Sequence, residues 1–395
     1  MLRVCQCKCG KAARNYFTKA DYYLDRQELA GRWGGSACRL LGLPEGGEVG
    51  KKPFDLLTDN RHPVTGEKLT VRQKAERTSG YDINFHCPKS VSLLYGLTSD
   101  PDILAAFQWA VRQAMRSMEA HMKTRVRTNG QCFDRLVGNM AWASFVHLTA
   151  RPVLGMPDPH LHAHCFGFNA VFDPVEDRWK AGQFREIKQQ APRFQALFRS
   201  LFAGRLARDG YDIEWKGDDF EIAGFSPALL RKFSRRTQLI ESEADRLGIV
   251  SDQLKDTLGA KTREKKQTDA TMTDLRRLWW LRLTDEERDQ LARAELHKRR
   301  PWPGDKRQRR HDLVEAISQP EGDDTHSELW QRQRIAAHER SRAEYNRHRQ
   351  TPTQRAGLGG ATRRPIRPFS PPVAARKTPL PSAASTQHRS NGHGR

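Results

Sequence analysis

The chain has 395 residues and carries 68 Lys and Arg against 47 Asp and Glu, which gives a formal net charge of +21. No run approaches the roughly 20 apolar residues of a membrane-spanning helix, so we expect no membrane insertion. The amino terminus lacks the apolar core of a secretory signal and the seven cysteines have no framework-like spacing, so we expect a cytoplasmic protein. The positive charge favours nucleic acid as the partner; the alternative is a basic protein whose charge serves only solubility or a tail.

The amino-terminal segment contains alternating cysteines followed by several tyrosines. Cys5, Cys7 and Cys9 have no second pair at zinc-finger spacing, so we predict a strand with small, buried side chains. A helix is predicted from about Lys11 to Leu24. It contains three tyrosines within eight residues, Tyr16, Tyr22 and Tyr23. A phenol that is activated by a cation or a base can attack a phosphodiester, whereas the alternative is an aromatic-rich helix that only packs against the core.

The next two hundred residues mix strand and helix patterns without strict alternation. Strands are predicted at Gly80–Phe85, Gly138–Leu148 and Leu161–Phe172. Helices are predicted at Ile103–Arg125 and Pro192–Asp209, followed by a hairpin whose turn is at Lys216–Asp218. This order predicts an α+β fold in which helices cover a mostly antiparallel sheet.

The carboxy-terminal part changes in composition. From Pro227 to about Arg299 the pattern is mainly helical and heavily charged, and after Glu344 there is no acidic residue. We therefore expect a first domain over residues 1–300 and a basic, largely disordered tail over residues 301–395, with a helix near 327–348. The tail is suited to attract phosphates or to act as a linker.

A cluster of histidines is the sharpest local signal. In Asp158-Pro-His-Leu-His-Ala-His164, His162 and His164 share one face of a strand. If the preceding strand pairs with this one, His147 can supply a third ligand to a cation such as Zn, Ni, Mn or Fe. His160 has the same parity but follows a proline. The alternative is that these are surface or core histidines without an ion.

Asp82 lies in the middle of the otherwise apolar strand GYDINF. A buried carboxylate needs a partner, and the second nitrogen of a ligand histidine or a tyrosine hydroxyl is suitable. The alternative is an edge strand that leaves Asp82 in solvent.

Several blocks together resemble the MobF class of conjugative relaxases, the TrwC/TraI type of the HUH endonuclease superfamily. The blocks are NYFTKADYYL, RWGGSACRLLGL, GYDINFHCPKSVSLL, HLTAR with DPHLHAH, and FSRRTQLIE with TREKK, in the order of the family. The resemblance covers roughly residues 1–285. It implies a palm-like antiparallel sheet with flanking helices, and a helical part over residues 227–300 that closes over DNA.

The resemblance also implies a role for each candidate residue. Tyr16 matches the nucleophile that attacks the nic-site phosphate of single-stranded DNA and becomes joined to the 5′ end. Tyr22 and Tyr23 match the tyrosines of a second transfer step. Asp82 matches a carboxylate that orients a ligand histidine and helps to take the tyrosine proton. The metal ligands match His147, His162 and His164, with Mg or Mn expected as the divalent ion and Zn or Ni as alternatives.

The function that the resemblance implies is strand-specific nicking and rejoining of DNA at an origin of transfer. The alternatives are an initiator of rolling-circle replication or transposition from the same superfamily, and a catalytically idle DNA-binding remnant. Phe17 departs from the family because it replaces the second tyrosine of the first pair. His160 stands where the family often has a polar amide, so it is a competing ligand.

Partners are expected beyond the DNA itself. PEGGEVGKK has Glu45 where a phosphate-binding loop needs its first glycine, so no motor is expected, and a separate helicase, a coupling ATPase and a secretion channel are candidate partners. Candidate DNA-contacting cations are Lys89, Arg185, Arg235, Arg236, Arg263, Lys265 and Lys266. Candidate base-stacking groups are Trp33 and Trp179.

Overall fold

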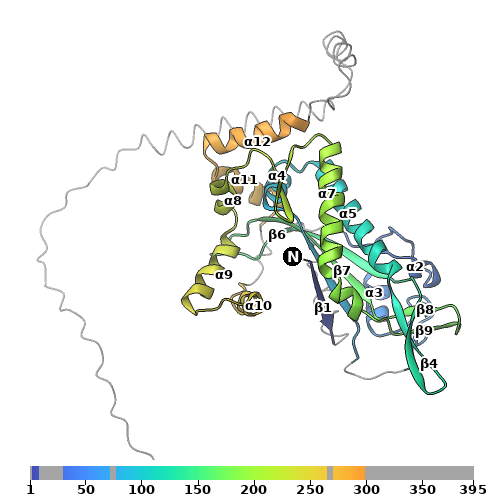
Figure 1. The fold of residues 1–395 in the computed structure, drawn as a ribbon. Coiled ribbons are helices and arrows are strands. Elements are labelled where there is room, and N and C mark those ends of the chain that lie inside the picture. Colours follow the sequence, from blue (N-terminus) through green and yellow to red (C-terminus); the bar gives the residue numbers. More distant parts are fainter. Residues whose placement is uncertain (1, 9–29, 72–76, 265–269, 299–395) are drawn as a thin grey trace, which may run out of the picture. The chain divides into compact units, whose positions relative to one another are not determined.

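The computed structural model describes residues 2–8, 30–71, 77–264 and 270–298 (Figure 1). Some predictions therefore fall outside the described residues. These are the helix at 11–24 with Tyr16, Phe17, Tyr22 and Tyr23, and also Cys9, Lys265, Lys266 and the tail over 301–395.

A five-stranded antiparallel sheet is the centre of the described fold, in the order β1-β3-β7-β6-β2. The strands are β1 (Arg3–Cys7), β2 (Arg32–Gly34), β3 (Gly80–His86), β6 (Trp142–Thr149) and β7 (Pro159–Phe168). The three segments predicted as strands, 80–85, 138–148 and 161–172, contain the three central strands β3, β6 and β7. The α+β fold with a mostly antiparallel sheet is confirmed.

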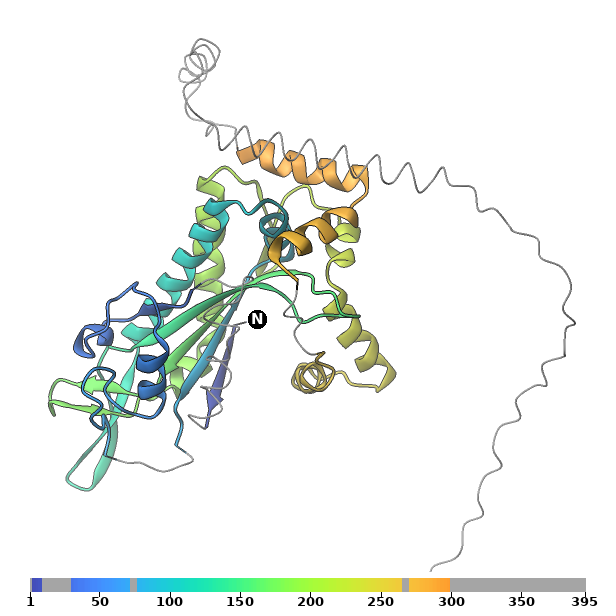
Figure 2. The same cartoon turned by 180° about the vertical axis from the view of Figure 1, so that it is seen from behind.

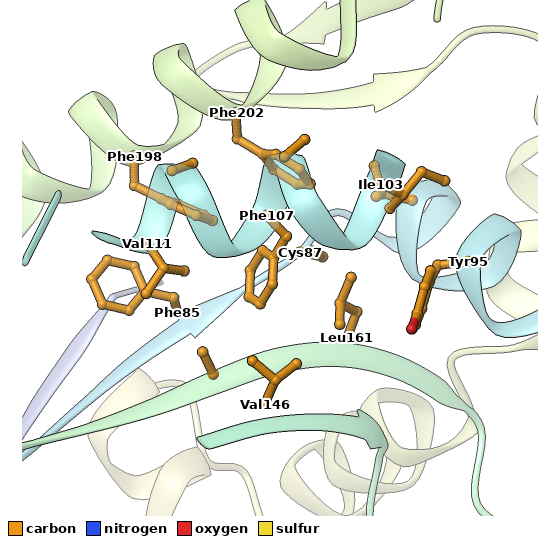
Figure 3. Packing of buried hydrophobic residues seen from close by; sticks show 14 of the residues in the cluster. Phe85, Cys87, Tyr95, Ile103, Phe107, Val111, Val146, Leu161, Phe198 and Phe202 are labelled. Carbon is orange, nitrogen blue, oxygen red and sulfur yellow. The ribbon is translucent and has the colours of Figure 1, made fainter. Parts of the chain in front are cut away.

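One face of the sheet is covered by α4 (Lys89–Thr98), α5 (Pro101–Ala120) and α7 (Ala191–Arg208), with α5 and α7 side by side (Figures 1 and 2). Phe85 of β3 and Phe107 of α5 both contact Phe198 of α7, with ring centroids 5.2 and 5.9 Å apart (Figure 3). Val146 and Leu161 approach this group from the sheet. Burial of these side chains is the main source of stability on this face.

The opposite face has a second, smaller core at one end of the strands. Here α2 (Ala37–Leu40) and α3 (Lys51–Thr58) pack against the sheet. Phe54 of α3 contacts Phe145, Phe166 and Phe168, with ring centroids 5.4–5.9 Å apart. The same face continues toward the other end of the strands, where polar residues replace the phenylalanines.

Three hairpins and six further helices complete the described residues. The hairpins are β4 (Lys123–Thr128) with β5 (Gln131–Leu136), β8 (Val171–Asp173) with β9 (Arg178–Lys180), and β10 (Ile213–Lys216) with β11 (Asp219–Ile222). The helices are α6 (Arg185–Gln189), α8 (Pro227–Lys232), α9 (Arg235–Arg246), α10 (Asp252–Lys261), α11 (Met272–Leu281) and α12 (Asp285–Lys298). The predicted turn between β10 and β11 and the helical character after Pro227 are confirmed. No helix among these residues is long and apolar enough to cross a membrane.

Three predicted boundaries were wrong. The helix predicted over Ile103–Arg125 ends at Ala120, and its last three residues belong to β4, which begins at Lys123 directly after the buried Met122. The strand predicted over Leu161–Phe172 is two strands, β7 and β8. The strand predicted from Gly138 begins only at Trp142, since Gly138 has a φ of +59° that an extended strand does not accommodate.

The predicted burial of the cysteine strand was also wrong in part. Arg3–Cys7 is a strand, but Cys5 is exposed and Cys7 is only half-buried. Side chains alternate along the strand, so Cys5 and Cys7 lie on one face of β1 and Leu2 and Val4 lie on the other. Leu2 and Val4 are in the hydrophobic core, and β1 is an edge strand. The buried face is therefore the opposite one.

Glu119 at the end of α5 joins this helix to the segments that precede α2 and β6. Its Oε1 accepts hydrogen bonds from the backbone N of Ser36 at 2.7 Å, the Ser36 hydroxyl at 2.7 Å and the backbone N of Met140 at 2.9 Å. Glu119→Ala should lower the free energy of unfolding by about 1–3 kcal/mol, because the buried backbone N of Met140 loses its acceptor and the link to Ser36 is lost. Glu119→Gln is the matched control, since its amide oxygen still accepts. Equal losses for the two variants in urea unfolding would contradict this assignment.

Candidate metal centre and active site

Three histidines converge on the same face of the sheet as α2 and α3, at the end of the strands that these helices do not cover. His147 of β6 lies directly opposite His162 of β7, and His164 follows on the same face of β7. One ring nitrogen from each residue lies within 4.8 Å of the others. His147 and His162 are only 5% and 9% exposed. The predicted pairing of the two histidine strands is confirmed, while the ligand role of the three residues stays a prediction.

Asp82 of β3 fixes the orientation of His164. Both carboxylate oxygens lie 3.0 Å from Nδ1 of His164, and the two side chains are 13% and 12% exposed. The amide of Asn84 also donates to this carboxylate at 3.4 Å. A hydrogen on Nδ1 that bonds to Asp82 leaves Nε2 of His164 with its lone pair for a cation. The alternative of a solvent-facing Asp82 on an edge strand was wrong, because β3 lies between β1 and β7.

The backbone fixes His162 in a similar way. Its Nδ1 donates to the carbonyl oxygen of His160 at 2.9 Å. A carbonyl only accepts, so the proton of a neutral His162 is on Nδ1 and the lone pair is on Nε2. Two of the three converging imidazoles therefore have defined tautomers that are suited to binding a cation.

His160 and His86 form a pair beside these three histidines. Nδ1 of His86 lies 3.1 Å from Nε2 of His160, and the rings stack with centroids 5.2 Å apart. Burial lowers the pKa of His86 to about 3 and the pKa of His160 well below its usual value, so both rings are neutral. His160 is not among the three converging residues. His86 was missed from the sequence, although it shares the parity of Asp82 within GYDINFH.

The donor set fits a divalent transition metal. Three imidazoles are a common ligand set for Zn, Ni or Mn. In two of them the nitrogen that does not face the ion bonds to a carboxylate or to a carbonyl, as is usual for metal ligands. Mg prefers oxygen ligands, so it suits three imidazole nitrogens less well. The residues present would hold the ion through His147, His162 and His164.

The predicted DNA-contacting residues differ in their surroundings. Trp33 is 3% exposed and lies in the core beside α2 and α3, so its prediction as a base-stacking group was wrong. Trp179 packs against Phe172, with ring centroids 5.5 Å apart. Arg185 and Arg263 are exposed and remain candidates.

Three other predicted cations are engaged within the protein. Arg235 bonds to Asp158 and to the carbonyl of Met156, and Arg236 bonds to the carbonyls of Gly259 and Thr262. Lys89 donates to the carbonyl of Pro159 at 2.8 Å. These bonds stabilise the fold, and the DNA-contacting role of the three residues stays a prediction. A sequence shows that a residue is basic, but not whether an internal acceptor lies next to it.

Lys89 should produce a measurable pH dependence of stability. Burial lowers its pKa to about 8, and Asp158 and Glu221 offset only part of that shift. Below pH 8 both folded and unfolded chains carry the charge, so the full burial cost applies. As the pH rises from 8 toward the unfolded pKa of about 10.4, only the folded chain loses the proton. Relative to Lys89→Met, the wild type should gain on the order of 2–3 kcal/mol between pH 7 and 10.5 in denaturant titrations. A constant difference would contradict burial of the ammonium group.

The metal centre can be tested by direct binding. Isothermal titration calorimetry of the purified chain with Mn²⁺ or Zn²⁺ should show one tight binding site per chain. His162→Ala should remove a ligand and abolish tight binding. Asp82→Asn should weaken binding by roughly 10–100-fold, because His164 loses the anion behind its ring. His121→Gln is the control, since His121 packs against Phe194 of α7 on the opposite face of the sheet. Unchanged binding in His162→Ala would make the histidines structural.

Most of the described chain is similar to known proteins. The family model described as TrwC relaxase matches residues 10–285. The multifunctional conjugation protein TraI of Escherichia coli strain K12 is 30% identical over 280 residues, which is 68% of this chain and 15% of TraI. A second Escherichia coli TraI is 31% identical over 252 residues, or 61% of this chain and 14% of that protein. The chain therefore spans only about a seventh of the length of these relatives.

Solved structures match over a similar region. A metal-bound structure of the conjugative relaxase TrwC in complex with oriT DNA is 28% identical, with a TM-score of 0.62, and covers 71% of this chain and 96% of that chain. A copper-bound complex of TrwC with oriT DNA is 26% identical, with a TM-score of 0.63, and covers 74% and 99% of the two chains.

Proposed function

The chain belongs to the TrwC relaxase family, and on that premise we propose that it nicks and rejoins one strand of single-stranded DNA at an origin of transfer. The observation that carries the proposal is the convergence of His147, His162 and His164, with Asp82 bonded to the last of them. The structures of TrwC with oriT DNA and metal support both the substrate and the ion. The proposed activity initiates conjugative DNA transfer.

The proposed reaction exchanges one phosphodiester for another. The phenolic oxygen of Tyr16 attacks the scissile phosphorus, the bond from phosphorus to the 3′ oxygen breaks, and the 5′ phosphate becomes joined to Tyr16. The phenolic proton passes toward the carboxylate of Asp82, the departing 3′ oxygen takes a proton from water, and the hydroxide so formed takes the proton from Asp82, so that one proton moves overall from Tyr16 to the 3′ oxygen. The bond energy is kept in the phosphotyrosyl link, so a 3′ hydroxyl can reverse the reaction and reseal the strand.

The three histidines act in this proposal by holding a divalent ion. When bound, the ion polarises a non-bridging phosphate oxygen and stabilises the charge that develops there. Asp82 keeps the His164 ring oriented, and the carbonyl of His160 keeps the His162 ring oriented. Both contacts exist before any substrate arrives, so little reorganisation is needed at the moment of reaction.

A second transfer is assigned to Tyr22 or Tyr23. Phe17 has no hydroxyl, so it offers no substitute for Tyr16. Tyr22 and Tyr23 lie six and seven positions after Tyr16, and each has a phenol that can open the phosphotyrosyl link or attack a second site.

The wider assignment extends the proposal to the whole chain. We propose residues 1–300 as the nicking domain, residues 227–300 as a helical part that clamps DNA, and residues 301–395 as a basic tail that attracts phosphates. A separate helicase, a coupling ATPase and a secretion channel are the proposed partners, and the cytoplasm is the proposed location.

A covalent adduct is the direct test of the proposal. The purified chain with Mn²⁺ and a 5′-labelled or 3′-labelled oligonucleotide from a candidate origin should form an SDS-resistant adduct that carries the 3′ label only. Tyr16→Phe should reduce the adduct at least 100-fold, because the attacking oxygen is gone. Tyr22→Phe and Tyr23→Phe are matched controls that should keep the first adduct.

Several outcomes separate this proposal from its alternatives. An adduct that persists in Tyr16→Phe moves the nucleophile to Tyr22 or Tyr23. A chain that binds the oligonucleotide but never forms an adduct is an idle DNA-binding remnant. An adduct on replication or transposon origins, and on none from transfer origins, favours the rolling-circle alternative.

A further inference from the structure

The start of strand β7 is tied to the helices that follow Pro227 through one buried carboxylate. Asp158 is 3% exposed. It accepts hydrogen bonds from the backbone N of Arg235 at 2.9 Å, from Nε of Arg235 at 3.0 Å and from Nη1 of Arg282 at 2.7 Å. Arg235 begins α9, and Arg282 directly follows α11 as its C-cap residue. One side chain thus joins two helices to the strand that carries His162 and His164.

The residues next to Asp158 also form hydrogen bonds to α4 or to the segment after Pro227. The backbone N atoms of Leu154 and Gly155 donate to the carboxylate of Glu264 at 2.9 and 3.0 Å. The remaining contacts use carbonyl oxygens of the same loop. Met156 accepts from Arg235, Pro157 from the indole of Trp279 and Pro159 from Lys89, each at 2.8 Å. Every residue from 154 to 159 therefore has a bond to α4 or to the segment after Pro227.

Arg282 connects Asp158 to the end of α8 as well as to α11. Besides Asp158, its guanidinium donates to the carbonyl of Lys232 at 2.5 Å and lies 4.2 Å from the ring centroid of Phe233. Helices α8 and α11 consequently meet at the same cation that fixes Asp158. A buried carboxylate with two guanidinium partners is costly to move, since displacement of either partner leaves an uncompensated charge.

This connected loop joins the two strands that carry the histidine cluster. The backbone N of Ala150 donates to the carbonyl of Asp158 at 2.9 Å, which closes the loop between β6 and β7. The register of these strands shifts between His147 and Thr149, next to that closure. Asp158 lies four residues before His162. A change in the position of Asp158 therefore acts on the pairing of His147 with His162.

We propose that Asp158 is a positioning residue that couples α9 and α11 to the histidine cluster through Arg235 and Arg282. The ion-dependent half of this inference rests on the proposed ligand role of the three histidines. Coupling is reciprocal, so an ion on the histidines should make α9 and α11 less mobile, and loosening of these helices should weaken ion binding. The helical part proposed to clamp DNA is then linked to the site of the chemistry.

Hydrogen exchange on the full chain tests the coupling without any ion. Arg282→Lys keeps the charge but loses the guanidinium fork, and Asp158→Asn removes the anion. Both should speed amide exchange at least threefold in peptides from β6, β7, α9 and α11. Exchange in the hairpin of β4 and β5 should stay unchanged. Glu243→Gln is the control, because it breaks only an exposed bond to Arg246 within α9.

The same experiment with Mn²⁺ separates this inference from the proposed metal centre. In the wild type, Mn²⁺ should slow exchange in α9 and α11 as well as in β6 and β7. In Arg282→Lys, protection should remain in β6 and β7 and disappear from the helices, and Mn²⁺ affinity should fall about fivefold.

The outcomes distinguish the two ideas. If Mn²⁺ does not bind the wild type, the proposed metal centre fails, and the ion-free exchange still decides the coupling. If Mn²⁺ binds but protects only β6 and β7 in the wild type, the coupling is wrong. Faster exchange everywhere in both variants, including the β4–β5 hairpin, would show a merely structural role and also overturn it. If Asp158→Asn does not fold, Arg282→Lys alone decides.

Discussion

The antiparallel register of β6 with β7 is the constraint on which the site depends. Side chains alternate along a strand, so a slip of one residue would turn His162 and His164 toward α5 and α7. The observed register places His147 opposite His162, and the phenylalanines that follow on the same face pack against Phe54. Burial of those aromatic rings at one end of the strands therefore also fixes the histidines at the other end.

The electrostatics of the site follow from burial. Desolvation disfavours the charged form of His86 and His160, and both remain neutral. The carboxylate of Asp82 bonds to His164, and its negative charge suits a site that is to hold a cation. The hydrogen bonds from Nδ1 of His164 to Asp82 and from Nδ1 of His162 to the carbonyl of His160 leave the Nε2 atoms of both rings for an ion.

The excess of basic residues serves two different purposes in this protein. Arg235 and Arg282 stabilise the loop between the histidine strands, where a buried Asp158 needs them. Arg185 and Arg263 are exposed and remain available to a phosphate backbone. The count of 68 Lys and Arg residues is therefore no measure of the number of phosphate contacts, because some of them pair with acidic groups inside the fold.

Features that depend on neighbouring residues could be predicted from local patterns. The period of two in DPHLHAH placed His162 and His164 on one face, and the pattern of GYDIEWKGDDFEIAG gave the β10–β11 hairpin. The pairing of the strands and the packing on each face of the sheet became visible in the fold. The fold brought His86 to His160 across 74 positions, buried Trp33 beside α3 and engaged Arg235 with Asp158. These contacts join residues that are distant in the chain, so their partners are set by packing of the whole sheet and leave no local pattern to read.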